Sequence, residues 1–576
     1  MQSPKQVLEQ RVADALRAAY PDIAAEGELV VPTQSAEHGD YQCNRALQMA
    51  KAAKSNPRAV AQAVVGALQV ADMCSAVEIA GPGFINFRLS PEWLGNAVAA
   101  RLADERLGVA RAVPVRTYVV DFSSPNVAKP MHVGHIRSTV LGDVLVRVLR
   151  FLGHDVVGDN HLGDWGTQFG MMILGYRDYV DQDALAGDPI GELKRIYQAV
   201  VERAKTDEAY AEKARAELAK LQAGDPENLA LWQEFIALSR QVFERIYRRL
   251  DISFDCWHGE SFYNDMLAGV VQDLLDKGIA RHDQGAAVIF FEAAEELRDK
   301  PFIIQKKDGA YLYSSSDLAA IKFRTESMHP DAMIYVVDGR QQLHFKQLFA
   351  AARLWGYRDV ELQHVWFGTI MGADNRPIKT REGEPPELSA LLDEAEERAL
   401  AIVREKQPDM AEAQLREVAR VVGIGAVKYG DLSQNRTSDY VFSWDKMLSM
   451  QGNSAPYLMY AYARVNSILE KAGVSGASLE ENPPRVILTE PSELSLAKKL
   501  LQFSDAVHNV LDGYRPNVLC TYTFELAGEL SSFLEECRVL DSPPEVRASR
   551  LALVHQTGRT LKHSLALLGI QTLPRM

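Results

Sequence analysis

The chain has 576 residues, of which 47% are apolar and 24% carry a charge, with a formal net charge of −14. This composition is that of a globular protein with three or four domains, and it excludes a disordered or collagen-like chain. The acidic balance excludes a generally basic nucleic-acid-binding protein, so any RNA contact would need local patches.

Cysteine usage and the absence of long apolar runs predict a cytoplasmic protein without a membrane segment. The five cysteines are scattered, without the spacing of a metal site, as expected in a reducing compartment. Cys43 and Cys537 lie outside any nucleophile motif and are expected to be buried. No basic-then-apolar leader is visible, and no apolar run reaches the roughly 18 residues of a membrane helix.

Residues 1–112 predict a first α+β domain without catalytic motifs. Val7, Val12 and Leu16 mark an amphipathic helix, and a further helix opens at Asn56-Pro57. The segment Val77–Leu89 reads as a strand, a Gly-Pro-Gly turn and a second strand.

The most informative stretch lies between a predicted strand at 116–122 and a helix that begins near Val133. It contains His132-Val-Gly134-His135, with Lys129 just upstream. The first turn of a helix offers free backbone N–H groups and the positive end of its dipole, which suits an anion. Gly134 lets a ligand approach the backbone, and both histidines can donate N–H to phosphate oxygens. Two surface histidines without function are the alternative.

The chain around this motif resembles class I aminoacyl-tRNA synthetases, and arginyl-tRNA synthetases in particular. The resemblance rests on two strings: Asp121-Phe-Ser-Ser-Pro-Asn-Val-Ala-Lys-Pro-Met-His-Val-Gly-His-Ile-Arg-Ser-Thr139, and Asn160-His-Leu-Gly-Asp-Trp-Gly-Thr-Gln-Phe-Gly170. The second string follows a predicted strand at 155–160, and its glycines allow tight turns next to a ligand.

Residues 113–450 predict a Rossmann-like catalytic domain with a parallel sheet, interrupted by a helical insertion at about 176–290. The insertion is charged, helical and poor in bulky apolar residues between 176 and 250, so a solvated helical segment without chemistry is the preferred interpretation. In the family it corresponds to a segment that helps to cradle the acceptor end of tRNA. Strands are predicted at 332–338 and 360–371, with polar residues after them. Ligands bind beyond the carboxyl ends of such strands.

Residues 451–576 predict an all-helical domain, similar to the anticodon-binding domain of the family. Tyr457, Tyr460 and Arg464 lie on its opening helix and suit unstacked bases, although core tyrosines are an equal alternative.

The resemblance implies an arginine–tRNA ligase that activates L-arginine with ATP and transfers it to the terminal adenosine of tRNA(Arg). It further implies Mg²⁺ with the ATP phosphates and a monomeric enzyme. Catalytic roles fall to His132, His135, Lys129 and Lys379, and ATP binding to His132, Gly134, His135, Lys129, Gly163 and Asp164. Arginine binding falls to Asp121, Ser123, Asn126, Tyr313, Asp317 and Gln341. Candidate tRNA contacts are Phe84, Asn86, Arg88, Tyr457, Tyr460, Arg464 and Met576.

Two positions in this assignment carry alternatives. Asp317 could be a helix cap rather than a ligand for guanidinium. The usual second signature of class I enzymes is a KMSKS-type loop, whereas this chain reads Ile378-Lys-Thr-Arg381. Arginyl enzymes commonly depart in this way, which leaves open whether Lys379 or Lys129 supplies the phosphate-binding charge.

Two other functions compete with this interpretation. A small-molecule adenylyltransferase could use the same histidine motif, but it would need neither the first domain nor the helical C-terminal domain. A catalytically silent tRNA-binding relative should lack the paired histidines or the acidic pocket, and this chain has both.

Overall fold

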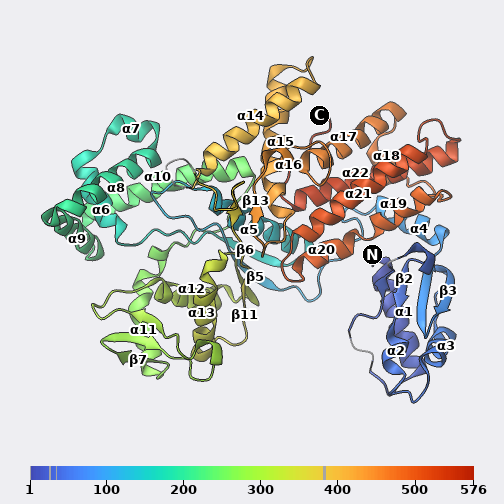
Figure 1. Ribbon diagram of the computed structural model, residues 1–576, viewed down its shortest axis with the longest axis horizontal. Coiled ribbons are helices and arrows are strands. Elements are labelled where there is room, and N and C mark those ends of the chain that lie inside the picture. The colour runs from blue at the N-terminus through green and yellow to red at the C-terminus, as the bar shows by residue number, and fades with distance from the viewer. Residues whose placement is uncertain (1, 25–26, 34, 380–384) are drawn as a thin grey trace. The chain divides into compact units, whose positions relative to one another are not determined.

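The computed structural model describes residues 2–24, 27–33, 35–379 and 385–576. These residues form two compact units (Figure 1). The first unit contains residues 1–111, 449–566 and 571–576, and the second contains residues 112–448 and 567–570. None of the helices in the described ranges combines the length and apolar character that a membrane crossing requires.

The N-terminal part of the first unit is an antiparallel sheet with helices against it. Its strands follow the order β1-β2-β4-β3: β1 (Val31–Pro32), β2 (Tyr41–Cys43), β3 (Cys74–Ala80) and β4 (Phe84–Leu89). Its helices are α1 (Pro4–Ala19), α2 (Arg45–Met49), α3 (Pro57–Ala67) and α4 (Pro91–Leu102). Ser3 and Asn56 cap α1 and α3, and a proline at the first position of each helix supplies the required φ.

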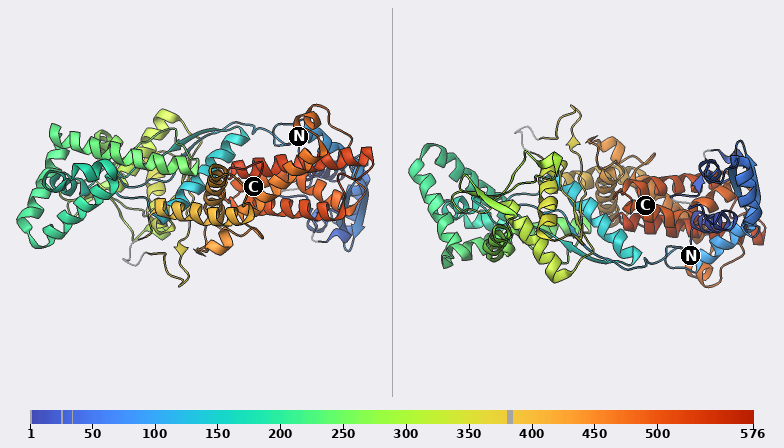
Figure 2. Two further views of the ribbon diagram at one scale, coloured as in Figure 1. Left: turned by 90° about the horizontal axis from the view of Figure 1, so that it is seen from above. Right: turned by 90° about the horizontal axis from the view of Figure 1, so that it is seen from below.

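The C-terminal part of the first unit is entirely helical. It contains α17 (Ala455–Ala472), α18 (Gly476–Glu481), α19 (Pro491–Leu501), α20 (Phe503–Leu511), α21 (Asn517–Glu536) and α22 (Pro544–Leu567). The long helices α17, α21 and α22 run side by side as a bundle in both views of Figure 2. Leucines, phenylalanines and alanines of these helices form its buried core.

The second unit is built on a four-stranded parallel sheet with the order β11-β10-β5-β6. Its strands are β5 (Thr117–Asp121), β6 (Asp155–Asp159), β10 (Ala332–Tyr335) and β11 (Glu361–His364). The strands are short; β5 and β6 carry Val-Val at their centres and β10 is fully buried, whereas β11 (Glu-Leu-Gln-His) is more polar. The helices α5 (Val133–Leu152), α12 (Tyr313–Met328) and α13 (Gln342–Trp355) connect or follow these strands. The predicted α/β class with a parallel sheet, a first α+β part and a helical last part is confirmed.

The five helices that directly follow β6 gather into a group of their own (Figures 1 and 2). They are α6 (Gln168–Tyr179), α7 (Gln182–Gly187), α8 (Pro189–Thr206), α9 (Glu208–Gln222) and α10 (Pro226–Leu250). The helical insertion was predicted to continue to about residue 290, but this group of helices ends at Leu250. Residues from α11 (Asn264–Asp276) and β8 (Ala286–Ile289) share one hydrophobic core with Val119 of β5.

The remaining elements of the second unit are short or lie at its edges. An antiparallel sheet joins β7 (Ala280–Asp283), β8 and β9 (Phe302–Gln305), and a parallel pair joins β12 (Ile370–Met371) and β13 (Tyr440–Val441). The other helices are α14 (Leu388–Lys406), α15 (Glu412–Leu432), α16 (Trp444–Met447) and the one-turn η2 (Glu260–Tyr263), η3 (Glu295–Leu297) and η4 (Gly339–Gln341). The single strand predicted at 360–371 is wrong, because the Gly368 N–H donates to the Arg436 carbonyl and the chain leaves the main sheet between β11 and β12.

Candidate active site

The loop that joins β5 to α5 has a strained backbone. Ser123, Ser124 and Ala128 have φ angles of 72°, 51° and 60°, which is the left-handed region that residues other than glycine rarely adopt. The Ser138 side chain holds this conformation, since the N–H of Ser123 donates to Ser138 Oγ at 2.8 Å and Ser138 Oγ donates to the carbonyl of Val336, directly after β10, at 2.6 Å. Such strain persists where the surroundings fix it, and it marks this loop as a candidate site.

His132 and His135 close the first turn of α5 and lie against each other, with their ring centroids 3.9 Å apart. His132 is the N-cap, and its Nδ1 accepts the N–H of Gly134 at 3.1 Å. His135 Nδ1 accepts the N–H of His132 at 3.0 Å. Because both Nδ1 atoms are acceptors, each neutral ring carries its proton on Nε2.

His135 is a neutral donor rather than a cation. Burial, together with the neighbouring His132, lowers the pKa of His135 to about 3. Gly134 and Lys129 are exposed beside the pair. A side chain at Gly134 would crowd the His132 ring, so glycine keeps this turn open. The turn thus presents N–H donors, and a lysine is close to them in sequence.

The second predicted loop runs along the first. Asn126 and Gly163 form a parallel bridge, with the N–H of Val127 donating to the Gly163 carbonyl at 3.0 Å. A Cβ at Gly163 would collide with Oδ1 of Asn126, which is exposed. Glycine at 163 is therefore required to seat the Asn126 side chain.

The Asp164 side chain has partners within the protein. Its two carboxylate oxygens accept the N–H and Oγ of Ser261, both at 2.7 Å, and the side chain is buried. Burial raises the pKa of Asp164 in spite of these bonds. The Asp164 carboxylate therefore stabilises the turn at 259–261, with one hydrogen bond at each of its oxygens.

The Ser123 side chain likewise has partners within the protein. Its hydroxyl is buried and bonds Thr139 Oγ1 at 2.8 Å and the Tyr247 hydroxyl at 2.7 Å. Because the Ser123 hydroxyl is buried and bonded to two other hydroxyls, it supports the loop.

Two predicted acids lie at the carboxyl edge of the sheet with protein partners. Asp121 Oδ2 accepts from Arg324 at 2.7 Å, and Asp317 Oδ2 lies 2.6 Å from Nε2 of His344. The helix α12 begins at Tyr313, so Asp317 stands in its second turn and is not the cap. Tyr313 is 60% exposed and packs on the His344 ring with 4.8 Å between centroids.

Gln341 ends η4 and is exposed, directly before α13. His344 follows one turn later on α13, so this segment lies beside Asp317 and Tyr313.

Arg324 is the site residue that sequence reasoning missed. It is fully buried on α12, and one of its nitrogens, NH2, donates to both Asp121 and Asp159, the latter at 2.9 Å. Burial alone would raise the pKa of Asp159, but Arg324 and His258 outweigh it and hold this pKa well below its usual range. The sequence shows only an arginine on a helix, 203 residues from Asp121, and offers no signal of the pairing.

Asp159, Cys256 and His258 lie close enough to share a metal ion. However, Asp159 Oδ2 already accepts from Arg324, and His258 Nδ1 lies 3.2 Å from the same oxygen. The guanidinium supplies the positive charge that a metal would bring and would repel a second cation. The trio is therefore part of an ion-pair network.

Lys379 is exposed at the end of a ribbon that starts from β12. The N–H of Ile378 returns to the carbonyl of Ile370 at 3.2 Å. Arg381, in the segment that stands in place of the KMSKS-type signature, lies outside the described residues. The chain then passes the histidine motif, because the N–H of Val133 donates to the Pro386 carbonyl at 2.9 Å and Glu387 bridges to His132. Lys379 is thus only seven residues from a segment that touches α5.

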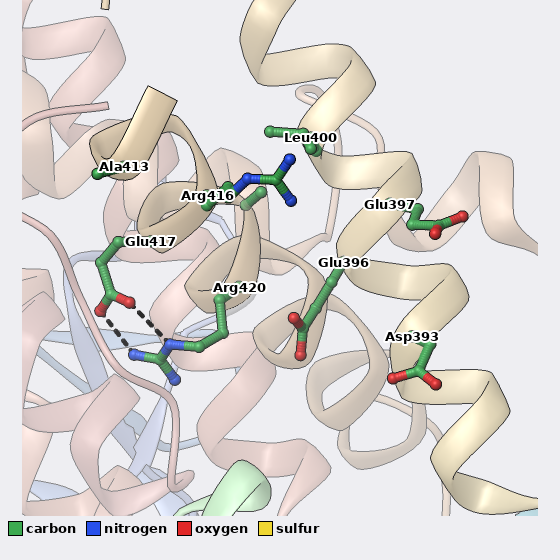
Figure 3. A pocket seen from close by; sticks show the side chains of 9 residues that line it. Asp393, Glu396, Glu397, Leu400, Ala413, Arg416, Glu417 and Arg420 are labelled. Carbon is green, nitrogen blue, oxygen red and sulfur yellow. Dashed lines mark hydrogen bonds and ion pairs between the residues drawn. The ribbon is translucent and has the colours of Figure 1, made fainter. Parts of the chain in front are cut away.

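A cavity of about 470 Å³ lies between α14 and α15 (Figure 3). Its charged lining comprises Asp393, Glu396, Glu397, Glu417, Arg416 and Arg420. Both arginines are bound to neighbouring glutamates: Arg420 to Glu417 at 2.7 Å, and Arg416 to Glu412 at 2.9 Å. The excess acid would repel phosphate, so this cavity does not suit ATP.

The predicted tRNA contacts lie in the first unit and differ in exposure. On β4, Arg88 is exposed and Phe84 half-buried, but Asn86 is only 4% exposed and accepts from Gln42 Nε2 at 2.7 Å. That bond leaves Asn86 poorly placed to read a base. On α17, Tyr460 and Arg464 are exposed.

Tyr457 and Met576 are half-buried. Tyr457 precedes Tyr460 and Arg464 at helical spacing, so the three share one face of α17.

Comparisons with known proteins agree along the whole chain. A family model described as "tRNA synthetases class I (R), catalytic domain" matches residues 97–444. A model for the "Arginyl tRNA synthetase N terminal domain" matches residues 6–89, and one for the "DALR anticodon binding domain" matches residues 458–576.

The similar proteins include curated relatives and solved structures. The chain is 46% identical over 581 residues to an arginine–tRNA ligase of Chromobacterium violaceum, and 45% identical over 576 residues to one of Marinomonas sp., with 99% of each chain covered in both cases. Its fold matches the arginyl-tRNA synthetases of Plasmodium falciparum (TM-score 0.86, 27% identity) and Thermus thermophilus (TM-score 0.83, 25% identity) over 100% of all chains.

Proposed function

The chain belongs to the arginyl-tRNA synthetase family and catalyses arginine–tRNA ligation, and from this premise we propose how its own residues divide the work. The substrates are arginine, ATP and tRNA. The arginine carboxylate attacks the α-phosphorus of ATP, pyrophosphate leaves, and a hydroxyl of the terminal adenosine of tRNA then displaces AMP from the arginyl-adenylate. Little covalent chemistry falls to the protein, so its task is to position reactants and to stabilise negative charge.

We assign the phosphate groups to the first turn of α5. His132 and His135 donate through Nε2–H, which their backbone bonds fix in place, and Lys129 adds charge. A neutral donor that is already oriented stabilises charge in the transition state without reorganising. Lys379 approaches from the ribbon after β12 as a second cation. Mg²⁺ would accompany the ATP phosphates and would offset their negative charge.

The arginine substrate binds, in this proposal, at the carboxyl edge of the sheet. Its guanidinium lies on Tyr313 and against Asp317, whose carboxylate accepts forked N–H donors. Its α-amino and carboxylate groups face Asn126, Gln341 and the remaining edge of Asp121. The Ser123 hydroxyl is left out because it is taken up inside the loop.

The tRNA contacts are assigned to one face of α17 and to β4. Tyr457, Tyr460 and Arg464 offer stacking and charge to unpaired bases, and Phe84 and Arg88 offer the same on β4. The enzyme acts in this proposal as a cytoplasmic monomer, in keeping with its five free cysteines.

The observation that carries the residue assignment is the pair of histidines whose Nδ1 atoms are both bound to backbone N–H groups. ATP–pyrophosphate exchange with arginine, with and without tRNA(Arg), tests the assignment of both sites. Exchange specific to arginine supports it, and a requirement for tRNA would show that tRNA completes the site. Exchange with another amino acid but not with arginine would overturn the arginine assignment.

A further inference from the structure

Arg324 lies across the carboxyl ends of three neighbouring strands. Its NH2 group donates to Asp121, the last residue of β5, at 2.7 Å and to Asp159, the last residue of β6, at 2.9 Å. Its guanidinium carbon is 5.7 Å from the ring centroid of Tyr335, the last residue of β10. This edge is where ligands bind in open parallel sheets.

The position is chemically unusual because a charge is expensive to bury. Arg324 is fully buried, and so is the Asp159 side chain. Two carboxylates within reach of a single nitrogen cannot both stay ionised without a cation between them. Removing one partner of such a network leaves an uncompensated charge. The protein therefore supplies its own guanidinium at the edge of the sheet where its substrate's guanidinium has to be recognised.

We propose that Arg324 is a positioning residue for the substrate arginine: an internal guanidinium that occupies Asp121 and Asp159 and thereby directs the substrate guanidinium to Asp317. This inference rests on the proposed placement of arginine at Tyr313 and Asp317. Arg324 stands two helical turns after Asp317 on α12. The helix α12 thus carries both Asp317, the acid that binds the substrate, and Arg324, the cation that neutralises the neighbouring acids.

Asp317 differs from the other two acids in its exposure and its partner. Its side chain is 22% exposed, against 8% for Asp121 and 0% for Asp159, and it is bonded to a histidine rather than to an arginine. It therefore keeps capacity to accept from a ligand. Without Arg324, Asp121 and Asp159 would attract another cation. The guanidinium of the substrate would then bind to these two acids instead of to Asp317, which is an unproductive position.

The test compares Arg324→Met and Arg324→Lys in arginine-dependent ATP–pyrophosphate exchange with tRNA present. We expect Arg324→Met to raise the KM for arginine about tenfold or more and to change the KM for ATP less than about twofold. Arg324→Lys should have a smaller effect, because it keeps the charge but loses the planar fork. A purely structural ion pair would lower stability without separating the two KM values.

Arg137→Met is the matched control. Arg137 is a buried arginine of the same unit, 1% exposed and paired with Asp431 at 3.0 Å instead of with Asp121 or Asp159. It should lower the Tm as Arg324→Met does and leave the ratio of the KM values for arginine and ATP unchanged. If the two variants change that ratio equally, or neither changes it, the inference is wrong.

Chemical rescue supplies a second readout if Arg324→Met folds poorly. In Arg324→Ala, millimolar methylguanidinium should lower the KM for arginine, whereas in the parent it should only compete with arginine. Competition in both proteins would overturn the role of Arg324. Asp317→Asn separates the two levels of the proposal. If it leaves the KM for arginine unchanged, the placement of arginine itself fails; if it raises that KM while Arg324→Met does not, only the present inference fails.

Discussion

The two halves of the site prepare for their ligands in opposite ways. At the start of α5, Nδ1 of His132 and Nδ1 of His135 each accept a backbone N–H, which places the proton of each neutral ring on Nε2. At the carboxyl edge of the sheet, Asp121 and Asp317 already have protein partners, Arg324 and His344. The phosphate half consists of imidazole rings whose orientation the backbone fixes, and the acid half consists of carboxylates bonded to other side chains.

Electrostatics explains this difference. A neutral imidazole carries no charge, so two such rings can lie against each other without the repulsion that two ions would suffer. Several carboxylates close together in a buried place repel one another, so some must protonate or bind a cation before the substrate arrives. Selectivity for a cationic side chain then depends on which acid the protein leaves accessible.

The phosphate half should show the largest effect. His135→Ala removes a donor to the charge that develops on the phosphates, and we expect kcat in ATP–pyrophosphate exchange to fall about 100-fold or more. His154→Ala is the control, because His154 lies beyond the other end of α5, where it accepts the N–H of Arg116. A loss within about threefold for His135→Ala would contradict the phosphate role.

The acid half should respond in binding rather than in turnover. Asp317→Asn keeps the shape and a bond to His344 but loses the charge, so the KM for arginine should rise roughly 30-fold, as expected for about 2 kcal/mol from a charge-assisted pair. The KM for ATP serves as the internal control. Equal rises in both KM values would mean that Asp317 supports the fold and not the substrate.

A substitution at Gly163 tests whether Asn126, which lies between the two halves in sequence, contacts the substrate. A Cβ there collides with Asn126 Oδ1, so Gly163→Ala should displace this amide and lower kcat/KM for arginine about tenfold. Gly187→Ala is the matched control, since a Cβ at Gly187 meets nothing within 4 Å. Identical kinetics for the two variants would show that Asn126 does not contact the substrate.

The sequence predicts the phosphate half better than the acid half, and the reason is locality. The strand, the loop and the histidine motif lie within 20 residues, so periodicity and helix-end chemistry suffice to place them. Arg324 meets Asp121 across 203 residues, and no local pattern encodes that meeting. Ser123 and Asp164 were assigned to ligands because sequence shows polar type but not the buried partner that occupies it. The strands β1 and β2 were missed for another reason: they are only two and three residues long, too short to show an alternating pattern.

The smallest expected effect concerns protons, and it has opposite signs in the two halves. His135 has a pKa lowered to about 3, so between pH 6.5 and 3 the unfolded chain binds a proton that the folded protein refuses, and stability falls as the pH falls. Near Asp317, burial and then the negative charges of Asp317 and Asp164 raise the pKa of Glu260 to about 7, although His161 opposes them. The folded protein therefore holds a proton on Glu260 between pH 7 and 4.5 that the unfolded chain lacks, and this gain in stability is lost as the pH rises through 7.

Glu260→Gln should remove the stability that the protein gains at low pH from the proton on Glu260. The free energy of unfolding of this variant should therefore fall more steeply from pH 7 to pH 5 than that of the parent. Urea titration at the two pH values measures it. The difference in slope should be on the order of 1 kcal/mol per pH unit, the value for one linked proton. His135→Asn should change the slope in the other direction by a similar amount. If both variants follow the slope of the parent, neither group is protonated differently in the folded and unfolded states, and the electrostatic contrast between the two halves would have to rest on the ion pairs alone.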